Sequence, residues 1–470
     1  MRWACILLPQ LALDGVLRRR VDRDAPLALL AGTAQRRVLH AVNPAARALG
    51  LKPGMTLTAA QALAGAVETV EHDPEDDVRW QRFLAAWAYR FSSQVSLRYP
   101  HALVVEIGAS LGLFGPWPRL EARLRGELAA LGFHHRIVAA PNPAAARALA
   151  NAHDGLAIPD EDRMRRALAQ LPVARAGFAP EAAAALERMG LRKLAQVQAL
   201  PRASLVRRFP AAVLRHLDTL TGERPEPLQW YRPPDRFDAR IELGFEVESH
   251  QALLFPLRRL SADLAAYLAG RDGGVQRFEL RLEHEDAADT RVPVGLLGTE
   301  REPALLFEVA RTRLERTGVP APVRGLRLVA RELPPFAPAH RELFDERPQQ
   351  SMPWEQLRER LRARLGDEAV HGLRVHHDHR PERAWRGERA TRPDADADAP
   401  PRPGWLLPRP VPLRGGAPDL LAGPERIESG WWDGDVRRDY YRVLTRQGQH
   451  AWVYAAPDER GHFMLHGWFA

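Results

Sequence analysis

The stretch RWACILLPQLALDGVLRRR, residues 2–20, decides how the rest of the chain is interpreted. Its apolar run from Trp3 to Leu8 predicts a strand buried on both faces. Pro9 ends that run, and a helical pattern follows it. An early strand that leads into a helix is typical of a catalytic sheet. This strand, however, ends in Leu7, Leu8 and Pro9, without an acid, a histidine or a nucleophile.

Residues 1–165 mix strands and helices, as a layered α/β or α+β domain would. We expect strands at 102–108 and 135–141, and a helix that begins at Asp73 with Pro74 in its first turn. Residues 35–65 are expected to be mainly helical, interrupted by the Gly/Pro turn LGLKPGM at 49–55.

Residues 166–222 contain no convincing strand pattern. PEAAAALERMGLRKLAQVQALP (180–201) predicts two short helices joined by a tight hairpin. The hairpin residues are Met189, Gly190, Leu191, Arg192 and Lys193. In a helix–hairpin–helix, the glycine lets the backbone approach a DNA phosphate, and the second helix offers its N-terminal amides. A plain helical hairpin explains the pattern equally well, so both interpretations stay open.

The second half of the chain begins after the proline-rich link YRPPDRF (231–237). Alternation and helical periodicity predict the order strand, helix, strand, strand, helix, strand over 237–335, which is a known compact unit. The expected elements are strand 237–248, helix 250–269, strands 275–284 and 290–297, helix 302–317 and strand 323–333. A connector (336–404) with a helix at 354–365 and a compositionally disordered linker at 386–404 comes next. A small β-rich domain is expected at 405–470.

Composition narrows the class of protein. The 470 residues carry a formal net charge of +8, and nearly all the cations are arginine, with lysine only at Lys52 and Lys193. A basic chain makes nucleic acid a candidate partner, although a GC-rich genome would also enrich arginine. The single cysteine, Cys5, excludes an internal disulfide. The sequence shows no secretion signal and no apolar stretch of about 20 residues, so we expect a cytoplasmic protein.

The stretch AVNPAARALGLKPGMTLTAAQAL (41–63) resembles the fingers segment of Y-family, lesion-bypass DNA polymerases. The matching residues are Asn43, Ala46, Arg47, Gly50, Lys52, Gly54 and Met55. AAARALANAHDG (144–155) resembles the palm helix of that family. The resemblance implies an α+β right hand, with palm and fingers at 1–165 (fingers about 12–72), a helical thumb at 166–232 and a little finger at 237–335.

The same resemblance implies that the polymerase metal site has been lost. Active members end the first strand in Asp-x-Asp and carry an Asp-Glu pair on a later hairpin, and these carboxylates hold two Mg²⁺ ions. In this chain the first pair falls on Leu7 and Pro9, and the second falls within Pro100, His101 and Ala102. We therefore predict no catalytic residues, no metal and no cofactor. Glu106 and Asp14 are nearby acids and candidate replacements for the lost ligands, but we expect them to have a polar role at a strand edge or in a cap.

Several stretches, among them ILLPQLALD and ESGWWDGDVRRDYYRV, look close to a catalytically degenerate branch of this family, the polymerase-like subunit of a bacterial damage-inducible mutagenesis cassette. The resemblance implies an adaptor in translesion synthesis. Its implied partners are DNA, the sliding clamp, a RecA-like small protein and an error-prone C-family polymerase.

Two segments fit the clamp-binding pattern Gln-x-x-Leu-Phe, which places a polar head and two apolar anchors in a pocket of the ring. HRELF supplies His340, Leu343 and Phe344 in the connector and is the preferred candidate. QALLF supplies Gln251, Leu254 and Phe255, but it opens a predicted amphipathic helix.

The sequence thus predicts a noncatalytic, DNA-binding adaptor. Two alternatives remain open at this point. One is an active Y-family polymerase with an altered metal site, and the other is a damaged-DNA-binding protein without a clamp contact.

Overall fold

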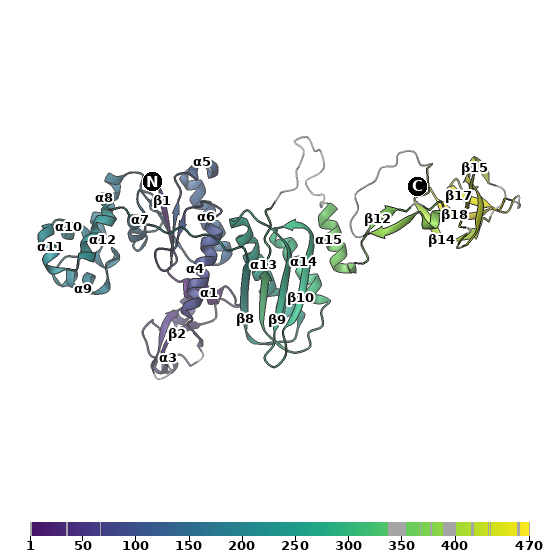
Figure 1. Ribbon diagram of the computed structural model, residues 1–470. Helices are drawn as coiled ribbons and strands as arrows, with labels where there is room; N and C mark the ends of the chain where they lie inside the picture. Colours follow the sequence, from purple (N-terminus) through teal and green to yellow (C-terminus); the bar gives the residue numbers. More distant parts are fainter. Residues whose placement is uncertain are drawn as a thin grey trace. The chain divides into compact units, whose positions relative to one another are not determined.

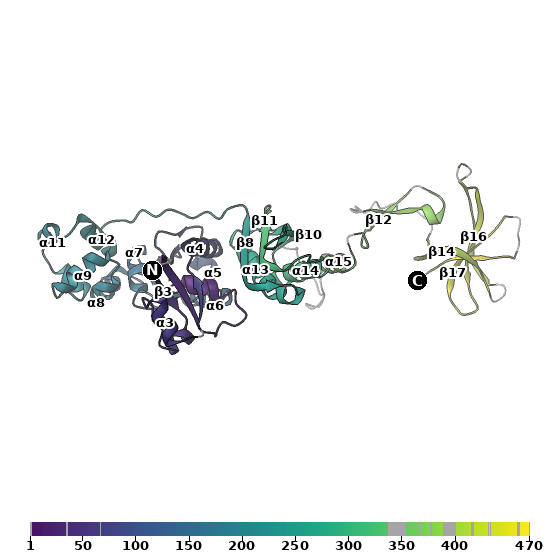
Figure 2. The same cartoon turned by 90° about the horizontal axis from the view of Figure 1, so that it is seen from below.

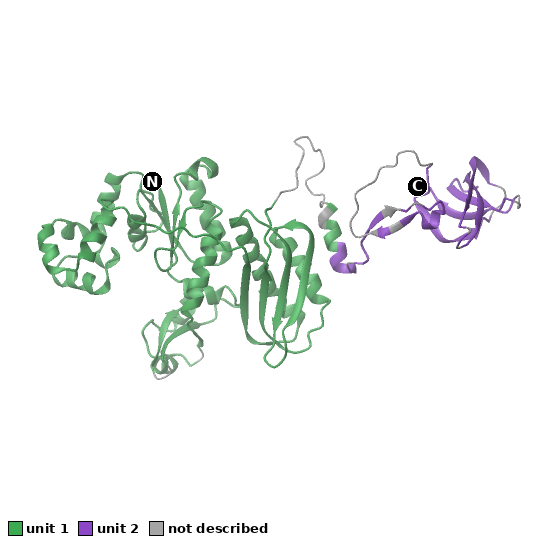
Figure 3. Ribbon diagram, viewed as in Figure 1, with its two compact units in different colours: residues 1–360 green, residues 361–470 purple. Residues whose placement is uncertain are grey.

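The computed structural model describes residues 2–33, 36–65, 67–336, 354–366, 368–376, 378–388, 401–414, 418–430, 432, 434–457 and 461–469. These residues fall into two compact units, 1–360 and 361–470, which Figure 3 colours separately. None of the described helices is long and apolar enough to cross a lipid bilayer.

A four-stranded antiparallel sheet forms the centre of the first unit, with strand order β5-β6-β1-β7 (Figure 1). Its strands are β1 (Trp3–Leu7), β5 (Val95–Ser96), β6 (Ala102–Glu106) and β7 (Arg136–Ala140). Helices α1 (Leu11–Leu17), α4 (Pro74–Ala88), α5 (Leu111–Phe114), α6 (Trp117–Leu131) and α7 (Pro143–Ala150) surround it. The predicted strands and the capped start of α4 are confirmed: the Asp73 carboxylate accepts from the amide of Glu75 at 2.9 Å.

Strand β1 is buried on both faces, as its sequence predicts. Cys5 and Leu7 belong to one hydrophobic cluster, which also contains residues of α7 and of the helices after residue 160. Ala4 and Ile6 belong to the opposite cluster, with residues of α4 and α6. Burial raises the pKa of the Cys5 thiol to about 12, so this cysteine is a core residue and not a nucleophile.

The prediction that residues 35–65 of the fingers segment are mainly helical is wrong in part. Residues 36–42 form a strand, not part of a helix, because this stretch pairs with the apolar strand before it. The sheet contains β2 (Leu27–Thr33), β3 (Arg36–Val42) and β4 (Glu68–Glu71), in the order β3-β2-β4. Two short helices, α2 (Pro44–Ala48) and α3 (Leu57–Leu63), follow the hairpin. The pattern was ambiguous because only the cross-strand partner distinguishes a short apolar strand from a helical segment.

The all-helical region after residue 160 is confirmed. It consists of α8 (Glu161–Gln170), a 3₁₀ turn (Val173–Arg175), α9 (Pro180–Arg188), α10 (Leu194–Gln198), α11 (Arg202–Arg208) and α12 (Ala211–Thr221). Its core is shared with one face of the central sheet, since Leu186, Leu217 and Leu220 cluster with Leu7.

The predicted β-α-β-β-α-β unit is also confirmed. Its elements are β8 (Phe237–Val247), α13 (His250–Gly270), β9 (Val275–Glu283), β10 (Thr290–Glu300), α14 (Pro303–Glu315) and β11 (Val323–Ala330). The sheet has the order β10-β9-β11-β8, and both helices cover the same face, as Figures 1 and 2 show. The fold class is therefore α+β.

A buried ion pair attaches this unit to the central sheet's helices. The guanidinium of Arg18 donates to Asp263 of α13 through both terminal nitrogens, at 2.8 and 2.5 Å, and its Nε donates to the carbonyl of Leu131 at 2.8 Å. Both charged side chains are almost fully buried. Close packing adds to the contact, because a Cβ on Gly270 would lie 1.9 Å from the carbonyl oxygen of Ala86.

The second unit contains a five-stranded antiparallel sheet with order β14-β18-β17-β16-β15. Its strands are β14 (Trp405–Pro412), β15 (Asp419–Ser429), β16 (Val436–Leu444), β17 (His450–Ala455) and β18 (Met464–Trp468). Before it come α15 (Trp354–Leu365), whose last turns fall in this unit, β12 (Gly372–Val375), a 3₁₀ turn (Pro381–Arg383) and β13 (Trp385–Glu388). Residues 386–388 of the predicted linker thus belong to a strand, because they pair with β12, and 389–400 lie outside the described residues.

We expect Asp263→Ala to lower the free energy of unfolding by about 3–5 kcal/mol, because Arg18 would keep an uncompensated buried charge. Urea denaturation of the full chain measures this loss. The matched control is Asp238→Ala, which removes the half-exposed partner of Arg327 and should cost at most about 1 kcal/mol. Equal losses in the two variants would contradict the structural role of the buried pair.

Candidate functional site: one end of the central sheet

The five positions predicted to have lost metal ligands lie together at one end of the central sheet. Leu7 pairs with Ala102 in the β1–β6 register, and the amide of Leu8 donates to the carbonyl of His101 at 2.8 Å. Pro9 and Pro100 adjoin these two segments in sequence. The structure therefore brings together the five positions that the resemblance selected. Their proximity alone does not show whether the chain binds metal ions.

The groups at this end of the sheet do not fit a pair of Mg²⁺ ions. The Leu7 side chain lies in the core, and Ala102 is fully buried. The carbonyls of Tyr99 and Ala102 accept from the side-chain amide of Gln81 at 2.7 and 2.8 Å, so these oxygens are already engaged. Mg²⁺ needs several hard oxygen ligands, and the five positions supply no carboxylate.

A cluster of histidines around one acid occupies the adjoining space. The Oδ2 of Asp77 in α4 lies 3.0 Å from Nε2 of His72 and 3.4 Å from Nε2 of His101. His40 of β3 stacks on His72 with ring centroids 4.1 Å apart. Burial and the neighbouring His72 lower the pKa of His40, which favours its neutral form.

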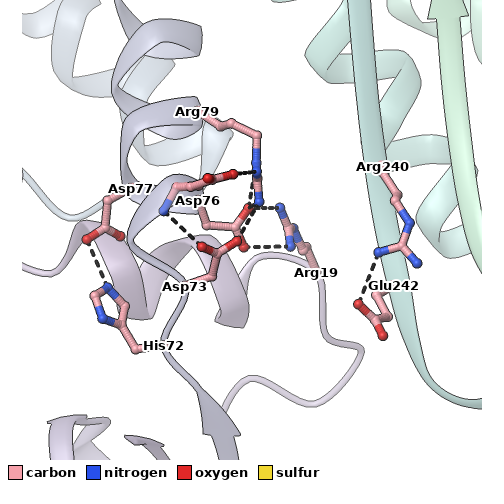
Figure 4. Close-up of polar contacts among 9 residues, drawn as sticks. Arg19, His72, Asp73, Asp76, Asp77, Arg79, Arg240 and Glu242 are labelled. Atoms are coloured by element: carbon pink, nitrogen blue, oxygen red, sulfur yellow. Dashed lines mark hydrogen bonds and ion pairs between the residues drawn. The ribbon is translucent and has the colours of Figure 1, made fainter. Parts of the chain in front are cut away.

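The acids at the start of α4 have separate partners. Figure 4 shows Asp77 directed to His72, whereas Asp73 and Asp76 meet Arg79 and Arg19. Among the described residues, no group of three or more His, Cys, Asp or Glu side chains is arranged to hold a metal ion. The sequence gives no signal of this histidine cluster, because only the tertiary fold brings its members together.

The two acids considered as replacements lie elsewhere. Glu106 pairs with Trp3, at the opposite end of β1 from Leu7, and its carboxylate accepts from Arg2 at 3.3 Å. Asp14 is buried in α1 and accepts from the amide of His134 at 2.8 Å. Burial raises the pKa of Asp14, with the hydrogen bonds to His134 acting in the opposite direction. Both acids therefore have structural partners, as expected.

The residual fingers motif is structural in part. Asn43 caps α2: its Oδ1 accepts from the amide of Ala46 at 2.9 Å, and its Nδ2 donates to the carbonyl of Ala25 at 2.7 Å. Arg47 and Lys52 are exposed, and neither forms an ion pair among the described residues. These two cations remain available to a negatively charged ligand.

The thumb hairpin has the predicted form, with Gly190 in the left-handed region at φ 79°. The expected N-terminal amides of the second helix are engaged in part, since the amide of Leu194, the first residue of α10, donates to the carbonyl of Leu171 at 2.9 Å. The side chain of Gln196 accepts from the amides of Arg192 and Lys193, at 2.7 and 3.0 Å. These two amides are therefore occupied, and a phosphate would have to be met by the cationic side chains.

The open face of the little-finger sheet carries a row of arginines that the sequence pattern could not align. Arg240, Arg327, Arg281 and Arg291 lie directly opposite one another across β8, β11, β9 and β10. Like charges in register repel, and flanking acids relieve this repulsion. Arg327 pairs with Asp238 at 2.7 Å, and Arg240 pairs with Glu242 at 3.0 Å (Figure 4).

Of the two predicted clamp-binding segments, the described residues include only the one in α13. His340, Leu343 and Phe344 lie outside the described residues. Gln251, Leu254 and Phe255 form the first turns of α13, where Gln251 is exposed and both apolar residues are partly buried. The second segment is therefore helical, not extended, in this structure.

Comparison with known proteins gives two kinds of match. Residues 15–151 match the impB/mucB/samB family. Along nearly the whole length, the chain is similar to the proteins named ImuB in two strains of Caulobacter vibrioides, NA1000 / CB15N and ATCC 19089 / CIP 103742 / CB 15. Each is 29% identical over 464 residues, covering 90% of this chain and 100% of the relative. The family match and the order of the described elements confirm the predicted fold class, an α+β chain with a Y-family-like hand, and the five-stranded sheet confirms the additional C-terminal β domain.

Solved structures with a similar chain trace include an insertion ternary complex of Dbh DNA polymerase and DinB from Sulfolobus solfataricus. Both have a TM-score of 0.41 and 16% identity. They cover 71% and 72% of this chain, and 99% and 100% of their own.

We expect Leu7→Asp to destabilise the protein by about 3 kcal/mol or more, because it places an unpaired carboxylate in the core. The control Leu7→Met should cost less than about 1.5 kcal/mol. Thermal melts with and without millimolar Mg²⁺ measure both. A Leu7→Asp variant that is as stable as Leu7→Met, with or without Mg²⁺, would contradict the burial of this side chain in the core.

Proposed function

We propose that this ImuB-like chain is a noncatalytic adaptor in translesion DNA synthesis and damage-induced mutagenesis. It acts in the cytoplasm, holds DNA, and joins the sliding clamp, the RecA-like partner ImuA and an error-prone C-family polymerase. The observation that carries this proposal is the apolar pairing of Leu7 with Ala102, where the resemblance places metal-binding carboxylates.

Phosphoryl transfer in this family needs metal ions to activate the primer hydroxyl and to neutralise the charge of the triphosphate. Asp77 is the carboxylate paired with His101, but its Oδ2 is engaged by two imidazoles. One acid in that setting does not replace the oxygen-rich ligand set of two Mg²⁺ ions.

DNA binding is the part of the ancestral function that this chain is proposed to keep. Arg192 and Lys193 project from the thumb hairpin, and the little-finger face presents its arginine row. Phosphate contacts of this kind give affinity without sequence preference and weaken steeply with salt. On the little finger, however, phosphates would compete with Asp238, Glu242 and Glu283 for the same arginines.

The clamp contact is assigned to His340, Leu343 and Phe344. The support comes from the sequence pattern and from α13, whose helical geometry disfavours the alternative Gln251, Leu254 and Phe255 as an extended peptide. Partner proteins would then assemble on a chain that is itself attached to the ring.

Purified full-length chain, supplied with primer–template, all four deoxynucleotides and either Mg²⁺ or Mn²⁺, should add no nucleotide in a template-dependent way. An active Y-family polymerase in parallel reactions is the positive control. Extension by the wild-type chain that disappears in Asp77→Asn would instead establish an active polymerase with an altered metal site.

The double variant Leu343→Ala/Phe344→Ala should weaken binding to purified sliding clamp at least about tenfold, because both apolar anchors are removed. Surface plasmon resonance measures the affinity, and circular dichroism checks the fold. The matched control is Leu254→Ala/Phe255→Ala. If only this control loses clamp binding while its fold persists, the site belongs to α13. If neither variant changes the affinity, the clamp assignment is wrong.

A further inference from the structure

A cavity of about 290 Å³ lies at the end of β1 opposite to the lost metal site. It opens where the central sheet, α7, α12 and the segment after α12 meet. Its lining includes Arg2, Trp3, Asn142, Arg224, Glu226 and Trp230. From Trp3 to Leu7 the strand rises about 13 Å, so this cavity is separate from the site already described.

Two parallel indoles stand at the cavity. The rings of Trp3 and Trp230 are inclined by only 4°, with centroids 6.0 Å apart. Trp230 is 45% exposed, so a large part of its indole remains in contact with solvent. The guanidinium of Arg2 lies over the Trp3 ring at 5.6 Å from its centroid. Flat aromatic faces next to an arginine are the elements with which proteins stack unpaired bases.

The backbone that follows Trp230 is held by two hydrogen bonds. The amide of Tyr231 donates to the carbonyl of Val95, in the edge strand β5, at 2.8 Å. Three residues further on, the Tyr267 hydroxyl donates to the carbonyl of Pro234 at 2.6 Å. Trp230 is thus presented by a tethered backbone, which lowers the entropy lost when a ligand stacks on it.

The free charge at the cavity is positive. Glu226 is neutralised, since it accepts from the Tyr99 hydroxyl and pairs with Arg98 at 3.3 Å. Arg224 is exposed and forms no ion pair among the described residues. Arg2 pairs with Glu106 but keeps 65% of its side chain exposed. An anionic ligand with a planar ring therefore matches the cavity in both shape and charge.

We infer that this cavity binds an unpaired nucleobase of single-stranded DNA, stacked on Trp230, whose indole is itself supported by Trp3, with Arg2 and Arg224 facing its phosphates. The inference rests on the proposed function for the identity of the nucleic acid. A volume of about 290 Å³ accommodates one nucleotide and excludes a base pair with its backbones. The cavity thus gives the chain a contact for a displaced or unpaired strand, distinct from the duplex contacts of the thumb and little finger.

The test is fluorescence anisotropy with a labelled oligothymidylate and the full-length chain. Trp230→Ala should weaken binding about tenfold, and Trp230→Phe should keep much of it, because base–aromatic stacking is removed in one and reduced in the other. The matched control is Trp354→Ala, which removes another exposed tryptophan, 64% exposed, and should leave the affinity unchanged. An abasic strand of equal length should bind the wild type as weakly as oligothymidylate binds Trp230→Ala.

A blunt duplex separates this inference from the proposed function. Duplex binding should be unchanged in Trp230→Ala and reduced in Arg192→Ala/Lys193→Ala. If Trp230→Ala binds oligothymidylate as the wild type does, or if the abasic strand binds equally well, the stacking site is refuted while duplex binding stands. If Trp230→Ala instead loses only the binding of a purified partner protein, the cavity is a protein-docking site and the inference is wrong. Absence of all DNA binding by the wild type would overturn the proposed DNA role as well.

Discussion

The burial of β1 on both faces is the constraint from which the first unit is built. Alternate residues of this strand enter two hydrophobic clusters, so the thumb helices pack through one face and α4 and α6 through the other. Leu7 is the last residue of the strand and its side chain is buried, so the hydrophobic core extends to this end of the sheet. Leu7, where the resemblance places a charged metal ligand, serves packing in this chain. A carboxylate at this buried position would therefore lower the stability of the core.

Much of the fold could be predicted from the sequence because its local signals agree with its tertiary contacts. The little finger is the clearest case: alternation in 275–283 and helical periodicity in 250–270 gave bounds within a few residues of the structure. The segment 36–42 failed because its apolar residues suit either a helix or a strand, and the deciding partner is β2. In the C-terminal unit a small β-rich domain was predicted, but not its strand order, in which β14 and β15 join the sheet from a part of the chain rich in proline.

The residues of the candidate site could likewise be predicted only in part. Sequence spacing located Leu7, Pro9, Pro100, His101 and Ala102 because the resemblance supplied their register. It could not reveal the cluster of His40, His72 and His101 around Asp77, whose members come from separate elements. Nor could it align Arg240 with Arg327, since that pairing depends on the strand order β11-β8. Trp3 and Trp230 are 227 positions apart along the chain, and only the fold brings their rings together.

The contact between Arg18 and Asp263 has a consequence for how the chain can be divided. Both charged side chains are almost fully buried, and each is the other's partner across the contact between the two parts. Fragments cut in the link near residue 232 would each hydrate one of them, and apolar surface of α4 and α13 would be uncovered at the same time. Hydration would repay the desolvation cost of the ion pair, so the halves would associate mainly through this apolar surface. A protease that nicks this link would leave a complex that still migrates as one particle.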